Sequence, residues 1–314
     1  MKVQTIFTMA SPYRDEFRIK AYTFGNGTKT LAIVGAMRGD EMQQQYVAAR
    51  LVNCMKQLEK KGQIEKGMSI SIIPSVNPFS MNIEKRFWAL DNTDINRMFP
   101  GYDLGETTQR IASGLFEFIK DFKYGIQLAS YYLPGNFVPH VRVLDTGTGF
   151  TDISLGRHFG FPYVTIKKPD PFDTVLLNYN WQIWDTQAFS LYAGTTDVIE
   201  ERTAQQSIDG IMRFLLHMGI VRDVLVDEGF ESEIIDEDQS ITVQAPHAGI
   251  LVDVKNAGST VTEGEVLARI IHPYDGTLVC EVPSPANGIV FFARNKSITY
   301  QNTLLFRIFR EETV

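Results

Sequence analysis

Short apolar runs alternate with amphipathic helical stretches from residue 30 to about residue 225. The runs 30–37 (TLAIVGAM) and 69–76 (SISIIPSV) have the length and composition of buried strands. Between them, apolar side chains recur at helical spacing from Tyr46 to Leu58, shortly before Gly62. This alternation predicts an α/β sheet covered by helices, in which a functional site lies at the carboxyl ends of the strands.

The alternation continues along the first two thirds of the chain. Further helices are predicted around 111–122 and 208–218, where apolar residues again share one face. Four more apolar segments are predicted as strands: 124–129, 140–144, 163–167 and 189–193. The first domain is therefore predicted to span residues 1–226.

A change of composition after residue 226 indicates a second domain. Residues 227–239 (DEGFESEIIDEDQ) are acidic, contain few large apolar side chains and are predicted to be a linker. Residues 240–314 have only strand patterns, and their sequence repeats: APHAGIL at 245–251 is echoed by SPANGIV at 284–290. Two similar β units predict a small barrel or sandwich with internal pseudo-symmetry.

The second domain resembles the biotinyl/lipoyl carrier fold. Carriers of this kind present a lysine on the turn between the two halves, whereas residues 256–295 contain no lysine. A swinging-arm role is therefore excluded, and we expect a structural or oligomerisation domain, since a fold alone does not confer function.

Charge and composition exclude several classes of protein. The net charge of −7 argues against nucleic-acid binding, which normally requires a basic surface. No apolar stretch approaches the roughly 20 residues needed to span a bilayer, and the first residues lack the apolar core of a signal peptide. Cys54 and Cys280 lie far apart in the sequence. We therefore expect a reduced, cytoplasmic protein that binds neither nucleic acid nor membrane, with its oligomeric state open and homo-oligomers allowed.

Several motifs follow one another in an order that identifies a family. Residues 35–41 (GAMRGDE) lie between a predicted strand and helix, and taken alone they fit a glycine turn with acidic residues at a helix start. Asn77-Pro78 follows the next strand, and Arg86 precedes 94–101 (DINRMFPG). With these motifs and the C-terminal β domain, the chain resembles the succinylglutamate desuccinylase/aspartoacylase family over nearly its whole length.

The resemblance implies a zinc-carboxypeptidase-like fold with an added β domain. It also implies hydrolysis of an amide between an acyl group and an amino acid, in which zinc activates water and a glutamate acts as general base. By the same resemblance, Asn96 and Arg97 would bind a substrate carboxylate, and Arg86 would stabilise the oxyanion or a second carboxylate. The alternatives are a surface salt bridge for Arg86 and a loop-stabilising role for Asn96 and Arg97.

Three positions depart from the family pattern. The first zinc histidine is replaced by Arg38, and the histidine of the family's Asp-Leu-His strand is replaced by Ala129. Tyr192 stands at the position of the general base. Glu41 is the only zinc ligand that persists, and a guanidinium cannot take the place of a ligand because it has no lone pair to offer. We therefore expect a degenerate metal site without a cofactor.

The positive charge of Arg38 can compensate for the missing metal ion. It lies three residues before Glu41, and it can neutralise that carboxylate without a metal. The five histidines form no close pair in the sequence, and only His140 lies near the predicted site.

Three hypotheses follow from these residues. The first is a metal-free, catalytically impaired deacylase-family protein that binds a small carboxylate. The second is a working hydrolase with an altered metal set, such as Asp40, Glu41 and His140. The third is a structural or assembly subunit.

Overall fold

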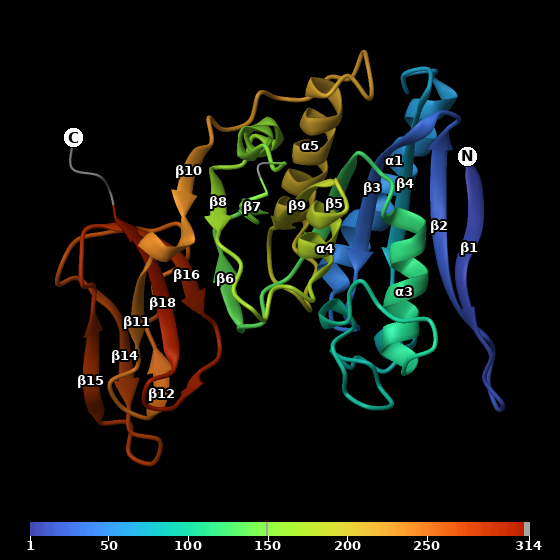
Figure 1. Ribbon diagram of the computed structural model, residues 1–314. Coiled ribbons are helices and arrows are strands. Elements are labelled where there is room, and N and C mark those ends of the chain that lie inside the picture. Colours follow the sequence, from blue (N-terminus) through green and yellow to red (C-terminus); the bar gives the residue numbers. More distant parts are fainter. Residues whose placement is uncertain (149, 311–314) are drawn as a thin grey trace. The chain divides into compact units, whose positions relative to one another are not determined.

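The computed structural model describes residues 1–148 and 150–310, which form two compact units (Figure 1). The first unit comprises Met1–Ser130 and His140–Ile234. The second comprises Tyr131–Pro139 together with the chain from Ile235 onward. Sequence patterns alone do not reveal that Tyr131–Pro139 groups with the C-terminal β unit.

A nine-stranded mixed sheet forms the centre of the first unit, in the order β1-β2-β4-β3-β5-β9-β7-β8-β10. Its strands are β1 (Lys2–Met9), β2 (Phe17–Gly25), β3 (Thr28–Ala36), β4 (Met68–Ser75), β5 (Tyr124–Ala129), β7 (His140–Leu144), β8 (Tyr163–Lys167), β9 (Gln187–Tyr192) and β10 (Glu233–Asp236). The central strands β4, β3, β5 and β9 run parallel. The acidic segment predicted as a linker contains β10, which forms one edge of this sheet.

Helices cover both faces of the sheet. The helices of the first unit are α1 (Met42–Lys60), α2 (Pro78–Met81), α3 (Thr107–Ile119), α4 (Leu177–Ile183) and α5 (Glu201–His217), with the 3-10 helices η1 (Ile95–Arg97) and η2 (Ile153–Phe159). A third 3-10 helix, η3 (Glu237–Gln239), belongs to the second unit. No helix in the described part of the chain is long and apolar enough to cross a membrane.

Both faces of β3 are buried, which explains why its sequence is almost continuously apolar. Leu31 and Ile33 pack into the core beneath α1 and α5, whereas Ala32 and Val34 pack into the core beneath α3 and α4. Successive side chains of a strand point to opposite faces, so a strand covered on both sides needs apolar residues throughout. The run 30–37 was therefore a reliable strand signal.

The second unit has two antiparallel sheets and an internal two-fold repeat. Its strands are β11 (Ile241–Gln244), β12 (Gly249–Val252), β13 (Thr260–Val261), β14 (Val266–Ile271), β15 (Leu278–Pro283), β16 (Gly288–Arg294), β17 (Ile298–Thr299) and β18 (Leu304–Arg310), joined by β6 (Gly135–Phe137). One sheet has the order β11-β18-β16-β13 and the other β15-β14-β12-β17. The two orders correspond strand by strand: β11 to β15, β18 to β14, β16 to β12 and β13 to β17. The two halves of the repeat therefore occupy equivalent places, as the sequence repeat predicts.

The sequence patterns predicted inner strands of the first unit correctly but not its outer strands β1 and β2. The strands predicted at 124–129, 140–144 and 163–167 have the same bounds in the structure. β1 and β2 were not predicted, because they alternate exposed polar with half-buried or buried residues and carry several charges. The resulting fold is mixed α/β with additional C-terminal antiparallel sheets.

Tertiary structure also pairs two histidines that are distant in the sequence. The rings of His158 on η2 and His217 on α5 are stacked, with centroids 4.9 Å apart. Burial lowers the pKa of His158, and the neighbouring charge of His217 lowers it further, while Asp152 opposes both. The absence of a close histidine pair therefore holds for the sequence and not for the fold.

This pair predicts a pH-dependent stability. Because the folded-state pKa of His158 is lowered, the unfolded chain binds more protons, and stability falls as pH decreases through the ordinary histidine value of about 6.5. The denaturant concentration at the unfolding midpoint is measured between about pH 8 and pH 5. We expect it to fall less steeply with decreasing pH in His158→Gln than in the native protein. The matched control is His247→Gln, which removes an exposed histidine. Equal slopes for the His158→Gln and native proteins would contradict the prediction.

Candidate functional site

The carboxyl ends of β3, β5 and β9 meet at one edge of the large sheet, because these neighbouring strands are parallel. The loop 37–41 follows β3 there, Ser130 follows β5, and Tyr192 ends β9. β7 runs antiparallel to β9, so its first residue, His140, pairs with Tyr192 at the same edge. Strand direction thus gathers the candidate residues from distant parts of the chain.

The Glu41 carboxylate is buried and both of its oxygens accept hydrogen bonds. Oε2 accepts from the backbone N–H groups of Met37 at 2.7 Å and Arg38 at 3.0 Å. Oε1 accepts from Arg38 Nη1 at 3.0 Å and from Ser130 Oγ at 2.5 Å. Only 1% of Glu41 is exposed. The carboxylate is therefore fully satisfied by protein donors.

The Arg38 guanidinium binds two carboxylates. Besides Glu41, it contacts Asp94, with Nη2 2.8 Å from Oδ2 and Nε 3.2 Å from both carboxylate oxygens. The Arg38 side chain is 9% exposed. Burial alone lowers the pKa of Arg38, but the charges of Glu41 and Asp94 outweigh it and raise that pKa. Arg38 is therefore held as a cation between two buried anions.

Asp94 is a site residue that the sequence reasoning missed. Its side chain also accepts from the backbone N–H of Asn96 at 3.1 Å and so begins the turn η1. The available signal was its place at the head of the DINRMFPG motif, directly before the predicted Asn96 and Arg97. An aspartate preceding a short turn is easily assigned to capping alone, and the second role appears only when Arg38 is brought beside it.

Asn96 and Arg97 differ in exposure. Asn96 is 8% exposed, and its Oδ1 accepts from Gln127 Nε2 at 3.1 Å. Gln127 Oε1 in turn accepts from Asn178 Nδ2 at 3.1 Å. The Arg97 side chain is 47% exposed, with Nε 4.0 Å from Asp94 Oδ2. Hydrogen bonds among buried side-chain amides thus fix Asn96, whereas the Arg97 guanidinium is half exposed to solvent.

Arg86 is paired with Asp40. Its Nη1 donates to Asp40 Oδ2 at 2.7 Å, and the backbone N–H of Gly39 donates to the Arg86 carbonyl at 2.9 Å. These contacts place Arg86 against the 37–41 loop, because its partners Gly39 and Asp40 lie between Arg38 and Glu41 in the sequence. The charge of Arg86 is therefore matched locally by a carboxylate.

Tyr192, the residue at the predicted general-base position, lies between an imidazole and a guanidinium. The His140 ring stacks on it with centroids 4.9 Å apart and planes 6° apart. Arg142 Nη1 donates to the Tyr192 hydroxyl at 2.8 Å. A phenol oxygen that accepts a hydrogen bond from a cation is a much weaker proton acceptor than a carboxylate. The geometry therefore gives Tyr192 a packing and hydrogen-bonding role.

Comparisons with known proteins agree with this architecture. Residues 27–128 match the succinylglutamate desuccinylase/aspartoacylase catalytic domain. This part of the chain belongs to the succinylglutamate desuccinylase/aspartoacylase family. A curated relative, the N-alpha-acetyl-L-2,4-diaminobutyric acid deacetylase of Halomonas elongata, is 24% identical over 79% of this chain and 71% of its own length.

Solved structures share the fold over almost the whole chain. A succinylglutamate desuccinylase from Silicibacter sp. TM1040 superposes with a TM-score of 0.81 at 18% identity, covering 98% of this chain and 94% of that one. The product-bound ectoine utilization protein EutE (DoeB) from Ruegeria pomeroyi gives 0.77 at 20% identity, with coverages of 93% and 89%. At these identities the likeness establishes the fold.

The family's zinc does not fit the side chains at this edge. A catalytic zinc takes about three protein ligands with lone pairs to donate. Here both oxygens of Glu41 are engaged, Arg38 offers only N–H donors, and Ala129 offers no donor atom. Within residues 1–148 and 150–310, no group of three His, Cys, Asp or Glu side chains is arranged to hold a metal. The alternative set of Asp40, Glu41 and His140 is thus not assembled.

Proposed function

We propose that this chain is a deacylase-family protein in which Arg38 replaces the zinc and which binds a small carboxylate without hydrolysing it. One observation carries the proposal: the surviving ligand, Glu41, gives both oxygens to protein donors, and Arg38 is one of them. Hydrolysis of an amide in this family depends on water activated by a metal. The described side chains at the edge supply binding groups but no comparable activation.

Charge pairing decides which cation is available to a ligand. Arg38 is opposed by Glu41 and Asp94, and Arg86 by Asp40. Arg97 is only at the limit of ion-pair distance from Asp94, 4.0 Å, and almost half of its side chain is exposed. Of the three residues expected to bind the substrate, Arg86 is thus engaged by Asp40, and Arg97 with Asn96 becomes the main binding group for a carboxylate.

Calorimetry tests this binding directly. N-acetylaspartate, N-succinylglutamate and related acids are titrated into the native protein and into Arg97→Ala. A charge-assisted hydrogen bond to a carboxylate contributes about 1.5–3 kcal/mol, and each 1.4 kcal/mol is about tenfold in affinity. We therefore expect Arg97→Ala to weaken binding at least about tenfold.

The control for this titration is Arg222→Ala. Arg222 is 52% exposed and pairs with Glu65. It follows Val221, which bridges to Ile64 just before β4 begins, and so lies at the opposite edge of the sheet. This control is expected to bind as the native protein does. If no acid binds at millimolar concentration, or if Arg97→Ala binds as well as the native protein, the structural-subunit hypothesis becomes the better one.

An active hydrolase is the second candidate, because the curated relative is a deacetylase. Release of acetate or succinate is measured from the same acids, with and without added zinc, using the native protein. Turnover that zinc increases and a chelator abolishes would favour this candidate. Turnover indistinguishable from buffer supports the metal-free proposal.

We propose a structural role for the C-terminal β unit. Its two interchanged sheets support the resemblance to the biotinyl/lipoyl fold. The strand β15 follows the turn between the two halves, and no lysine occurs in residues 256–295 to carry a prosthetic group. The unit therefore lacks the attachment residue that a carrier needs.

A further inference from the structure

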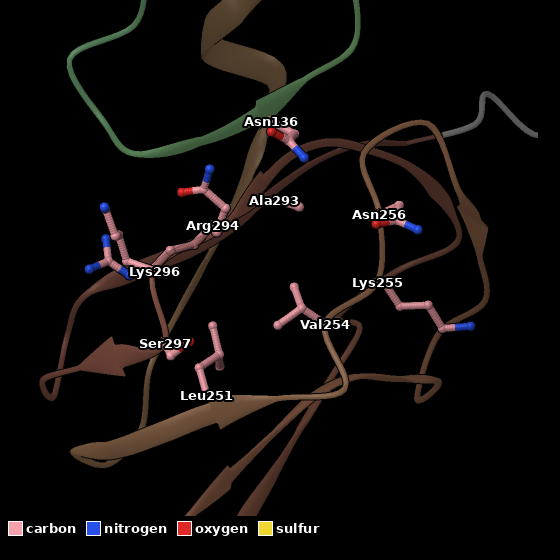
Figure 2. Close-up of a pocket in the computed structure, with 10 residues that line it drawn as sticks. Asn136, Leu251, Val254, Lys255, Asn256, Ala293, Arg294, Lys296 and Ser297 are labelled. Atoms are coloured by element: carbon pink, nitrogen blue, oxygen red, sulfur yellow. The ribbon is translucent and has the colours of Figure 1, made fainter. Parts of the chain in front are cut away.

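The second unit contains a small polar pocket that the proposed function does not use. It has a volume of about 200 Å³ and lies between β6, the segment after β12 and the end of β16 (Figure 2). Its lining includes Arg294, Lys296 and Ser297, together with three asparagines, Asn136, Asn256 and Asn295. No aspartate or glutamate lines it. A donor-rich pocket free of carboxylates is notable in a chain with a net charge of −7.

Arg294 has no carboxylate partner in residues 1–148 and 150–310. Its Nη2 donates to the Ile298 carbonyl at 3.3 Å, and its Nε is buried without an acceptor. Burial lowers the pKa of Arg294, and no neighbouring carboxylate opposes that effect. A guanidinium nevertheless stays charged in a protein. Arg294 thus carries a partly desolvated cation with an unused hydrogen-bond donor, which is costly unless an anion completes it.

The other charges around the pocket differ in their availability. Lys255 is paired with Glu265 at 2.7 Å, and Figure 2 shows its side chain directed away from Arg294 and Lys296. Asp253, the acidic residue next to Val254 in the chain, is held by Arg269 at 3.0 Å. Lys296 has no acidic partner in the described part of the chain. Two cations, Arg294 and Lys296, therefore remain for a ligand.

The backbone around these side chains is fixed. Leu251 N–H donates to the Ser297 carbonyl at 2.7 Å, and Asn295 N–H donates to the Pro134 carbonyl at 3.5 Å. Asn136 pairs with Ala293 in the register of β6 and β16. The donors are thus held by a sheet and by anchored loops, which lowers the entropy cost of binding.

We infer that this pocket binds a phosphate group, free or as the ester of a small metabolite. The guanidinium, ammonium and hydroxyl donors come from one stretch of the chain, Arg294, Lys296 and Ser297, and two further segments add the side-chain amides of Asn136 and Asn256. Several donors of different kinds suit an anion with several oxygens. A guanidinium is also well suited to phosphate because it can donate two parallel hydrogen bonds. The small volume admits the phosphate group and places any remaining part of an ester in solvent.

The inference is tested by titrating inorganic phosphate, glycerol 3-phosphate and acetate into the full chain in chloride-free buffer. Chemical shifts of backbone amides in residues 293–297 report the binding site. We expect at least one phosphate compound to bind at millimolar concentration or tighter, and to bind more tightly than acetate. The stronger of the two phosphate ligands identifies whether free phosphate or an ester is the natural source.

Variants separate this pocket from the Arg97 site. Arg294→Gln and Lys296→Gln should each weaken phosphate binding about tenfold, as expected for loss of a charge-assisted contact. Lys255→Gln and Arg97→Ala should leave it unchanged, since Lys255 is engaged by Glu265 and Arg97 lies in the first unit. Lys296 is an exposed residue, so its variant remains informative if Arg294→Gln fails to fold. The inference is overturned if phosphate fails to bind, if acetate binds equally well, if Lys296→Gln binds normally, or if Arg97→Ala abolishes binding.

Discussion

Arg38→Ala is expected to destabilise the protein by about 3–5 kcal/mol, the cost of breaking a buried ion pair by removing one partner. The variant would leave Glu41 and Asp94 as buried carboxylates without the guanidinium that now contacts both. Glu41 would keep its backbone and Ser130 donors, but those contacts carry no full positive charge. The free energy of unfolding from urea titration measures the effect.

Two companion variants show whether the loss comes from unpaired charge. Arg222→Ala removes an exposed arginine that pairs with Glu65, and it should change the free energy of unfolding by no more than about 0.5 kcal/mol. Adding Glu41→Gln to Arg38→Ala removes one of the two unpaired carboxylates and should recover part of the stability. An Arg38→Ala protein as stable as Arg222→Ala would show that the buried carboxylates do not depend on Arg38.

Arg38→His combined with Ala129→His is expected to create a zinc site. The double variant removes the guanidinium from Glu41 and supplies two imidazoles, giving the two-histidine, one-glutamate set found in catalytic zinc sites. Ala129 faces the right way, because side chains two apart share a face of a strand and Gln127 on that face contacts Asn96. We expect about one zinc per chain to be retained after dialysis, whereas the native protein should retain none.

Elemental analysis after dialysis, with and without a chelator, measures the zinc. The single variants Arg38→His and Ala129→His serve as controls, since each leaves the set one ligand short. Zinc should also raise the melting temperature of the double variant alone, because a ligand that binds only the folded state stabilises it. A folded double variant that retains no zinc would show that Ala129 does not occupy the ligand position. Zinc retained by the native protein would refute the metal-free proposal itself.

The two arginine-based experiments address different parts of the proposed function. Arg38 fixes the interior of the site, where it neutralises Glu41 and Asp94, and its loss should appear in stability. Arg97 is half exposed, and its loss should appear in ligand affinity with little change in folding. Recognition and turnover are separable in this way because a carboxylate is held by hydrogen bonds and charge, whereas hydrolysis requires activated water.

Much of the first unit could be predicted from local sequence. Three strands, at 124–129, 140–144 and 163–167, were predicted with the bounds they have in the structure, because buried strands are short and continuously apolar. The repeat between 245–251 and 284–290 predicted the two matching halves of the β unit. The edge strands β1 and β10 were missed, since an edge is partly exposed and its polar residues resemble those of a loop.

The sequence by itself predicted the resemblance to the family, three departures from its pattern at Arg38, Ala129 and Tyr192, and the ion pair of Arg38 with Glu41 that the structure contains. These depend on residue identity and on spacings of a few residues, which a motif preserves. Only the tertiary structure decided that Asp94 shares the Arg38 guanidinium, that Asp40 holds Arg86, and that His158 meets His217. Each of these contacts joins segments separated by 46 or more residues. Such pairs form because strand order and direction bring the ends of separate elements to one place, and no local pattern in the sequence encodes which ends will meet.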